Sequence, residues 1–188
     1  MIKEKDFTAL IAVKYKSERV PKKNTRSFAS TTLLDLKISQ LVESKIFKNI
    51  LVSSESNLIL NKCKKYKVTL HKRNPYYSTS HVPMSEVYKY LAKQVKTPYI
   101  AWIPVTNPLI DGKIYKKALN TFIGMDHKKY DSLLSVNNIQ DYLYYKNEPL
   151  NFTRVPHTRS QDLKKIFAVN FGINILSSYS GERAVYRG

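Results

Sequence analysis

A cluster of cationic and polar side chains follows the first apolar segment of the chain. Residues 14–24 read Lys-Tyr-Lys-Ser-Glu-Arg-Val-Pro-Lys-Lys-Asn, with five cationic side chains in eleven residues. A triphosphate needs several fixed positive charges and neutral hydrogen-bond donors, because its own charge is spread over many oxygens. Lys14, Arg19 and Lys23 can supply the charge, and Ser17 and Asn24 the neutral donors. The residue types thus suit a nucleoside triphosphate, although on composition alone a solvated basic loop is the stronger interpretation.

The segments around this loop predict strands that alternate with helices. Short apolar runs of strand length occupy residues 7–13, 49–53, 67–71 and 99–103, and the first lacks alternation, as in strands buried on both faces. Helices are expected between them, at 34–42, 57–66 and 83–95. This order predicts an α/β fold with a Rossmann-like, doubly wound, mainly parallel sheet. Its ligands are expected at the carboxyl ends of the strands, in the loops after Val13, Ser53 and Ile103.

The second half of the chain departs from this rhythm. A helix at 112–125 and a strand at 132–136 continue it, but Tyr-rich segments follow at 142–153, before an apolar strand at 166–176. We therefore expect one domain spanning residues 1–188, with 140–165 as an excursion from the sheet.

Composition limits the classes of protein that the chain can represent. Its 188 residues are 43% hydrophobic, enough for the core of one domain, and no apolar run approaches the length of a membrane span. The first residues are too charged for a secretory signal, so we expect a cytoplasmic protein. Cys63 has no partner cysteine, so we expect no internal disulfide. The net charge of +18 favours anionic ligands.

Several catalytic classes lack their motifs in this chain. No Walker A, G-x-G-x-x-G, G-x-S-x-G or H-E-x-x-H pattern is present, which argues against P-loop, dinucleotide-binding, hydrolase and zinc-protease functions. The histidines have no metal-ligand spacing. A nucleic-acid-binding domain is the weaker interpretation, since only charge and interleaved tyrosines support it.

The first loop resembles a motif of one enzyme family. Residues 14–24 are similar to the strand-loop pattern R-x-x-S-x-R-x-P-x-K-N of the acylneuraminate cytidylyltransferases (CMP-sialic acid synthetases) and their CMP-Kdo synthetase relatives. Weaker matches follow in the same order. Val-Ser-Ser-Glu-Ser at 52–56 resembles V-S-T-D-S, Thr-Asn-Pro-Leu at 106–109 resembles T-S-P-L, and residues 159–163 and 170–172 resemble the late R-x-Q-D and N-G elements.

This resemblance implies a three-layer αβα nucleotidyltransferase fold of GT-A-like type and a reaction of CTP with an acidic keto-sugar. It also implies a homodimer built from the 140–165 region. Carried over by position, the phosphate-binding and catalytic residues are Lys14, Arg19 and Lys23. The nucleotide-binding residues are Ser17, Asn24, Ser53 and Thr106, and the substrate-binding residues are Arg73, Arg159 and Gln161.

The chain also differs from the family pattern at several positions. Lys14 stands where the family has arginine and therefore lacks the bidentate fork, and Glu18 replaces a frequent lysine. Pro104 and Ile110 replace a glutamine and an arginine. Mg²⁺ is expected from the resemblance, but the D-x-D acid pair of the family falls beyond Gly188, so its ligands are not identifiable. The alternative is a degenerate or truncated homologue that binds nucleotide or an anionic partner without catalysis.

Overall fold

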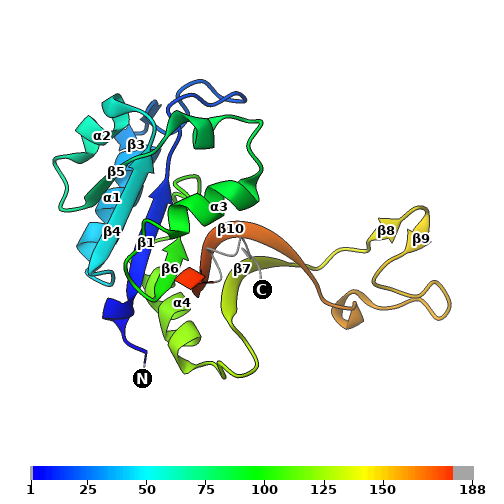
Figure 1. Ribbon diagram of the computed structural model, residues 1–188. Helices are drawn as coiled ribbons and strands as arrows, with labels where there is room; N and C mark the ends of the chain where they lie inside the picture. Colours follow the sequence, from blue (N-terminus) through cyan, green and yellow to red (C-terminus); the bar gives the residue numbers. More distant parts are fainter. Residues whose placement is uncertain (1, 180–188) are drawn as a thin grey trace. The chain divides into compact units, whose positions relative to one another are not determined.

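Six strands form one mixed sheet in the computed structural model, which describes residues 2–179 (Figure 1). The strand order is β5-β4-β1-β6-β10-β7. β1 pairs in parallel with β4 and β6, β4 pairs in parallel with β5, and β10 runs antiparallel to β6. The strands are β1 (Phe7–Ala12), β4 (Asn49–Ser54), β5 (Thr69–Lys72), β6 (Tyr99–Trp102), β7 (Ser132–Ile139) and β10 (Ile166–Ser177). This arrangement confirms the predicted mainly parallel sheet.

Four α-helices connect the strands of the sheet. They are α1 (Leu33–Ser44), α2 (Asn57–Cys63), α3 (Met84–Ala92) and α4 (Gly112–Gly124). Short 3-10 turns lie at η1 (Glu4–Asp6), η2 (Pro75–Ser78) and η3 (Ser160–Asp162). The sequence patterns did not predict a small hairpin between the first loop and α1, formed by β2 (Ser27–Phe28) and β3 (Thr31–Thr32). Two residues per strand are too few for a periodic pattern.

The core is divided into two clusters by the sheet, because successive strand residues point to opposite faces. In β1, Ala9 and Ile11 face the cluster that α1, α2 and α4 cover, whereas Leu10 faces the cluster that α3 covers. The larger cluster includes Ile38 of α1 and Phe122 of α4. The fold therefore has the three αβα layers that the sequence predicts, and Figure 1 shows α3 crossing one face of the sheet.

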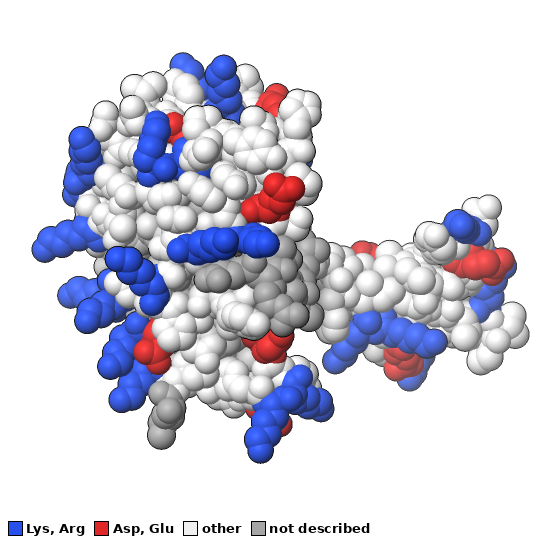
Figure 2. Space-filling view, viewed as in Figure 1, with Lys and Arg blue, Asp and Glu red and all other residues white. Residues whose placement is uncertain are grey.

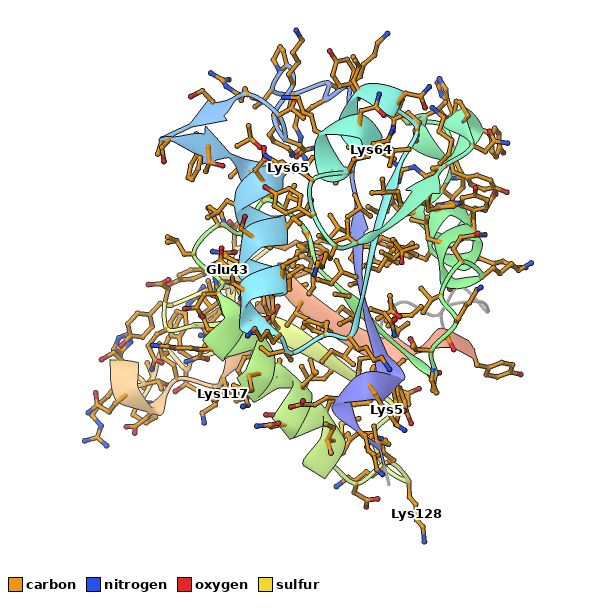
Figure 3. All side chains as sticks on the ribbon, turned by 90° about the vertical axis from the view of Figure 1, so that its left-hand side faces the viewer. Lys5, Glu43, Lys64, Lys65, Lys117 and Lys128 are labelled. Atoms are coloured by element: carbon orange, nitrogen blue, oxygen red, sulfur yellow. The ribbon has the colours of Figure 1, made fainter. Side chains whose placement is uncertain are left out.

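Local signals set the starts of α1 and α4. The Thr32 side chain caps α1 by accepting a hydrogen bond of 3.1 Å from the Asp35 amide, and Asp111 caps α4 in the same way at 3.2 Å from the Ile114 amide. The start of α4 packs closely against the end of α1. A Cβ atom on Gly112 would lie 2.6 Å from the Cβ of Ser44, so only glycine fits there. Figure 3 views the molecule with these two helices toward the reader and labels Glu43 on α1 and Lys117 on α4.

The chain divides into two compact units. Of the described residues, 2–134 and 172–179 form one unit, which holds most of the sheet, and 135–171 form the other. The second unit contains the antiparallel pair β8 (Tyr144–Tyr145) and β9 (Glu148–Pro149). Its buried Asn151 accepts a hydrogen bond from the Leu143 amide and donates one to the Asp141 carbonyl. The excursion expected at 140–165 falls inside this unit.

Among residues 2–179, no helix is both long and apolar enough to cross a membrane.

Candidate functional site

A cleft of about 780 Å³ lies where β1, β5 and β6 end. The carboxyl ends of parallel strands are where open α/β sheets bind their ligands. The lining comes from the first loop, from the segment after η2, from the start of α3 and from the loop after β6. Its polar side chains include Lys14, Lys16, Ser17, Glu18, Arg19, Lys23, Asn24, Arg73, Ser78, Thr79, Ser80, His81 and Thr106. Apolar atoms come from Met84, Val87, Trp102, Pro104 and Val105.

Cations exceed acids in this lining, as they do over the whole chain. The lining has five lysine or arginine residues and one carboxylate, that of Glu18. Figure 2 shows lysine and arginine side chains spread over the visible face of the molecule, among fewer acidic ones. The cleft is therefore suited to an anion that carries several charges.

Asn24 closes the first loop at its base. Its buried side-chain amide donates a hydrogen bond of 3.0 Å to the Lys14 carbonyl, and its main-chain carbonyl accepts one from the Leu34 amide, also at 3.0 Å. One residue thus ties the end of β1 to the start of α1. The cationic side chains between these points belong to a loop whose two ends are fixed.

Glu55 connects the first loop to two other walls of the cleft. Its carboxylate accepts hydrogen bonds from the Tyr15 amide at 2.7 Å, from Arg73 Nη2 at 3.1 Å and from Ser78 Oγ at 3.2 Å. Burial raises the pKa of this carboxyl group, but the hydrogen bonds from backbone amides and from Arg73 outweigh burial, and the net pKa lies below its usual value. Glu55 therefore remains a carboxylate at neutral pH.

Arg73 is held inside the wall of the cleft. Its side chain is 2% exposed, and Nη2 also donates to the Val13 carbonyl at 2.7 Å. Burial lowers the pKa of the guanidinium group, and Glu55 acts against this shift. Its Nε is buried without a hydrogen-bond partner within the described part of the chain. In the structure, Arg73 donates hydrogen bonds to Val13 and Glu55. Its predicted contact with substrate stays a prediction.

The loop after β6 is fixed by a buried lysine of α1. Lys37 Nζ donates hydrogen bonds to the carbonyls of Asn107 at 2.9 Å and Ile110 at 2.6 Å, and to the Tyr115 hydroxyl at 2.8 Å. Burial lowers the pKa of Lys37 to about 8, and the charge of Asp111 acts in the opposite direction. Lys37 thus holds the end of this loop through three defined contacts.

Ser53 lies behind the cleft rather than in its lining. It is fully buried, and its hydroxyl lies 3.0 Å from Nδ1 of His71, whose Nε2 lies 3.4 Å from the Tyr90 hydroxyl. Burial lowers the pKa of His71, and the charge of Arg73 adds to this effect. Tyr77 stacks on Tyr90 with ring centroids 3.9 Å apart. This chain of contacts supports the segment around η2.

The structure brings together most of the residues that the sequence predicted. Arg73 and Thr106 line the cleft. So do the five predicted residues of the first loop, Lys14, Ser17, Arg19, Lys23 and Asn24. Arg159 and Gln161 belong to the second unit, where Arg159 Nε lies 2.6 Å from the Asp162 carboxylate. Their predicted contact with substrate stays a prediction.

Sequence reasoning gave no role to Glu55, to residues 78–81 or to Trp102. It included Glu55 in the match at 52–56 and expected ligands in the loop after Ser53, but no local pattern indicated the partners of this carboxylate. The residues from Ser78 to His81 form no motif, and only the fold brings them to the first loop.

The described residues do not form a site for Mg²⁺. This ion prefers six oxygen ligands, usually including one or two carboxylates. Glu18 is the single acid in the cleft lining, and the Glu55 carboxylate already accepts from Tyr15, Arg73 and Ser78. No group of three acidic, histidine or cysteine side chains suited to a metal occurs within residues 2–179.

Comparisons with known proteins agree with this geometry. The family model described as cytidylyltransferase matches residues 8–174. N-acylneuraminate cytidylyltransferase A of Danio rerio is 24% identical over 169 residues, which cover 85% of this chain and 39% of the relative. The chain thus spans about two fifths of the length of this curated relative.

Solved structures share the fold at low sequence identity. A cytidylyltransferase from Leptospira borgpetersenii has a TM-score of 0.61 at 22% identity, over 95% of this chain and 63% of that one. The CMP:2-keto-3-deoxy-manno-octonic acid synthetase complexed with CTP has a TM-score of 0.60 at 12% identity, over 94% and 76%. The bifunctional IspDF from Campylobacter jejuni has a TM-score of 0.67 at 14% identity, over 97% and 43%.

Proposed function

The chain belongs to the cytidylyltransferase family, and we propose that it transfers the CMP group of CTP to an acidic keto-sugar of the sialic-acid type. The observation that carries this proposal is the convergence of the five predicted first-loop residues on one cleft at the carboxyl ends of the strands. The relative from Danio rerio, named for an acylneuraminate substrate, supports the choice of sugar class.

The reaction requires positioning and charge stabilisation rather than a covalent intermediate. A sugar hydroxyl attacks the α-phosphorus of CTP, a new P–O bond forms, and the bond to the leaving pyrophosphate breaks. Lys14, Arg19 and Lys23 would hold the phosphate oxygens, where negative charge accumulates on the leaving group. Ser17 would donate a neutral hydrogen bond to a phosphate oxygen. Cytidylyltransferases generally use a divalent metal ion, but the described residues do not fit one, and we assign no step to it.

The apolar side of the cleft is suited to the uncharged parts of the ligands. Met84, Val87 and Trp102 line it together with Pro104. Pro104 cannot donate a hydrogen bond, so we do not assign sugar recognition to this position. Most ligand pockets combine such apolar walls with a few placed polar groups.

The second candidate function is nucleotide binding without catalysis. The scarcity of carboxylates in the cleft favours it, because phosphoryl transfer usually depends on acid-bound metal ions. The two candidates agree on the binding of CTP and differ only in turnover.

Calorimetric titration of CTP, ATP and GTP tests the part that both candidates share. We expect selective binding of CTP that weakens by roughly tenfold or more in Lys23→Ala, because one charge-assisted hydrogen bond is lost. Lys117→Ala is the matched control, since this lysine lies on α4 outside the cleft lining (Figure 3). Equal affinity for the three nucleotides would refute the cytidylyltransferase proposal.

A further inference from the structure

We propose that Glu55 is a positioning residue, which holds the segment around Lys14 in the conformation that binds phosphate. The inference rests on the proposed function for the identity of the ligand. Glu55 does not line the cleft itself, and its hydrogen bonds connect three segments that do.

The carboxylate uses both of its oxygens. Oε1 accepts the Tyr15 amide at 2.7 Å, directly after Lys14 in the chain. Oε2 accepts hydrogen bonds from Nη2 of Arg73 and from the hydroxyl of Ser78. Arg73 directly follows β5, and Ser78 is the last residue of η2. Three segments that are distant in sequence therefore share one anionic acceptor.

Arg73 extends this hold to the residue before Lys14. The same Nη2 that bonds Glu55 donates to the Val13 carbonyl at 2.7 Å. The main chain is thus fixed on both sides of Lys14, while the Lys14 carbonyl accepts the Asn24 amide at 3.0 Å. With three backbone contacts set, the direction in which the Lys14 side chain leaves the main chain is set as well.

The charge of Glu55 is needed for this arrangement. Arg73 is 2% exposed, and a buried guanidinium without its carboxylate is costly. Neutralising Glu55 would therefore favour conformations in which Arg73 reaches water, and its bond to the Val13 carbonyl would be lost with that movement. The side chain at position 55 then controls a loop that lies 40 residues earlier in the chain.

Hydrogen exchange and CTP titration on the whole chain test the proposal. In Glu55→Gln we expect the Tyr15 amide to exchange roughly tenfold faster and the affinity for CTP to fall by about tenfold, as for the loss of a charged hydrogen bond. Glu55→Asp keeps the charge and should recover part of both. Asp35→Asn is the matched control, because Asp35 is likewise a carboxylate with several donors, the side chains of Thr32, Tyr66 and Lys65, and lies outside the cleft lining.

The outcomes separate this inference from the function on which it rests. Unchanged Tyr15 exchange in Glu55→Gln would overturn it, and so would an equal loss of CTP affinity in Asp35→Asn at a temperature where all variants are folded. If the unmodified protein bound no CTP while Tyr15 exchange still accelerated, the hold of Glu55 on the loop would be supported and the proposed function refuted.

Discussion

Asn24 has one role that the structure shows and one that the sequence predicts. The sequence motif predicts a hydrogen bond near the nucleotide, and the structure shows the Asn24 amide joined to the Lys14 carbonyl. A residue that closes the loop also determines where its cations lie. We therefore expect ligand binding and folding of the loop to be coupled at this position.

Replacing Asn24 by alanine should weaken both properties. We expect Asn24→Ala to lower the free energy of unfolding by about 1 kcal/mol, because the Lys14 carbonyl loses its buried donor. The affinity for CTP should fall by roughly tenfold as the loop loosens. Urea unfolding and calorimetry measure the two effects. Asn57→Ala is the control, since the exposed Asn57 side chain accepts only from Lys72, and a change in stability equal to that of Asn24→Ala would contradict this account.

The first loop is the part of the site that sequence could predict. Its residues are adjacent in the chain, and their spacing carries the information. The contacts of Glu55 with Tyr15 and Ser78 join residues 40 and 23 positions apart. Such contacts depend on how far each strand extends before its loop begins, which no local pattern specifies. The predicted roles of Ser53 and Arg73 considered neither the burial of Ser53 nor the pairing of Arg73 with Glu55.

At the scale of elements, short apolar runs predicted the strands of the sheet, and the spacing of apolar residues predicted helices between them. The buried strands β1, β4 and β6 appear as short apolar runs because both of their faces are covered. The direction of β10 did not follow from its sequence, since an apolar strand reads the same in either orientation. Its antiparallel pairing with β6 is known from the structure alone.

Lys37 connects two elements through a buried charge, which makes stability depend on pH. The pKa of Lys37 is about 8 in the folded protein and 10.5 as an ordinary lysine. Below pH 8 both states hold the proton, and the folded state bears the full cost of the buried charge. Between pH 8 and 10.5 the unfolded state binds more protons, so this contribution to stability rises with pH.

Comparison with Lys37→Met isolates this effect. We expect the free energy of unfolding of the unmodified protein, relative to the variant, to increase from pH 7 to pH 9.5. The variant removes the hydrogen bonds that Lys37 donates to the carbonyls of Asn107 and Ile110, but that loss is the same at each pH. Urea unfolding at several pH values measures the difference, and a difference that stays constant would show that Lys37 is not neutralised in this range.

At the scale of the whole molecule, we expect the net charge and the second unit to influence which partners bind the chain. The net charge of +18 draws anions toward a surface rich in lysine (Figure 2). The second unit exposes large apolar side chains, among them Tyr144, Tyr145, Val155 and Phe167. Aromatic residues are enriched at protein interfaces, which supports a homodimer formed through this region. The homodimer stays a prediction.

Pyrophosphate release tests the central claim most directly. The protein is incubated with CTP and Mg²⁺ and with a panel of eight- and nine-carbon keto-sugar acids, and released pyrophosphate is measured for each. We predict release that requires both CTP and one class of sugar acid, and that falls at least tenfold in Lys23→Ala but not in Lys117→Ala. No sugar-dependent release, with CTP bound selectively, would contradict catalysis by this chain and favour a nucleotide-binding homologue.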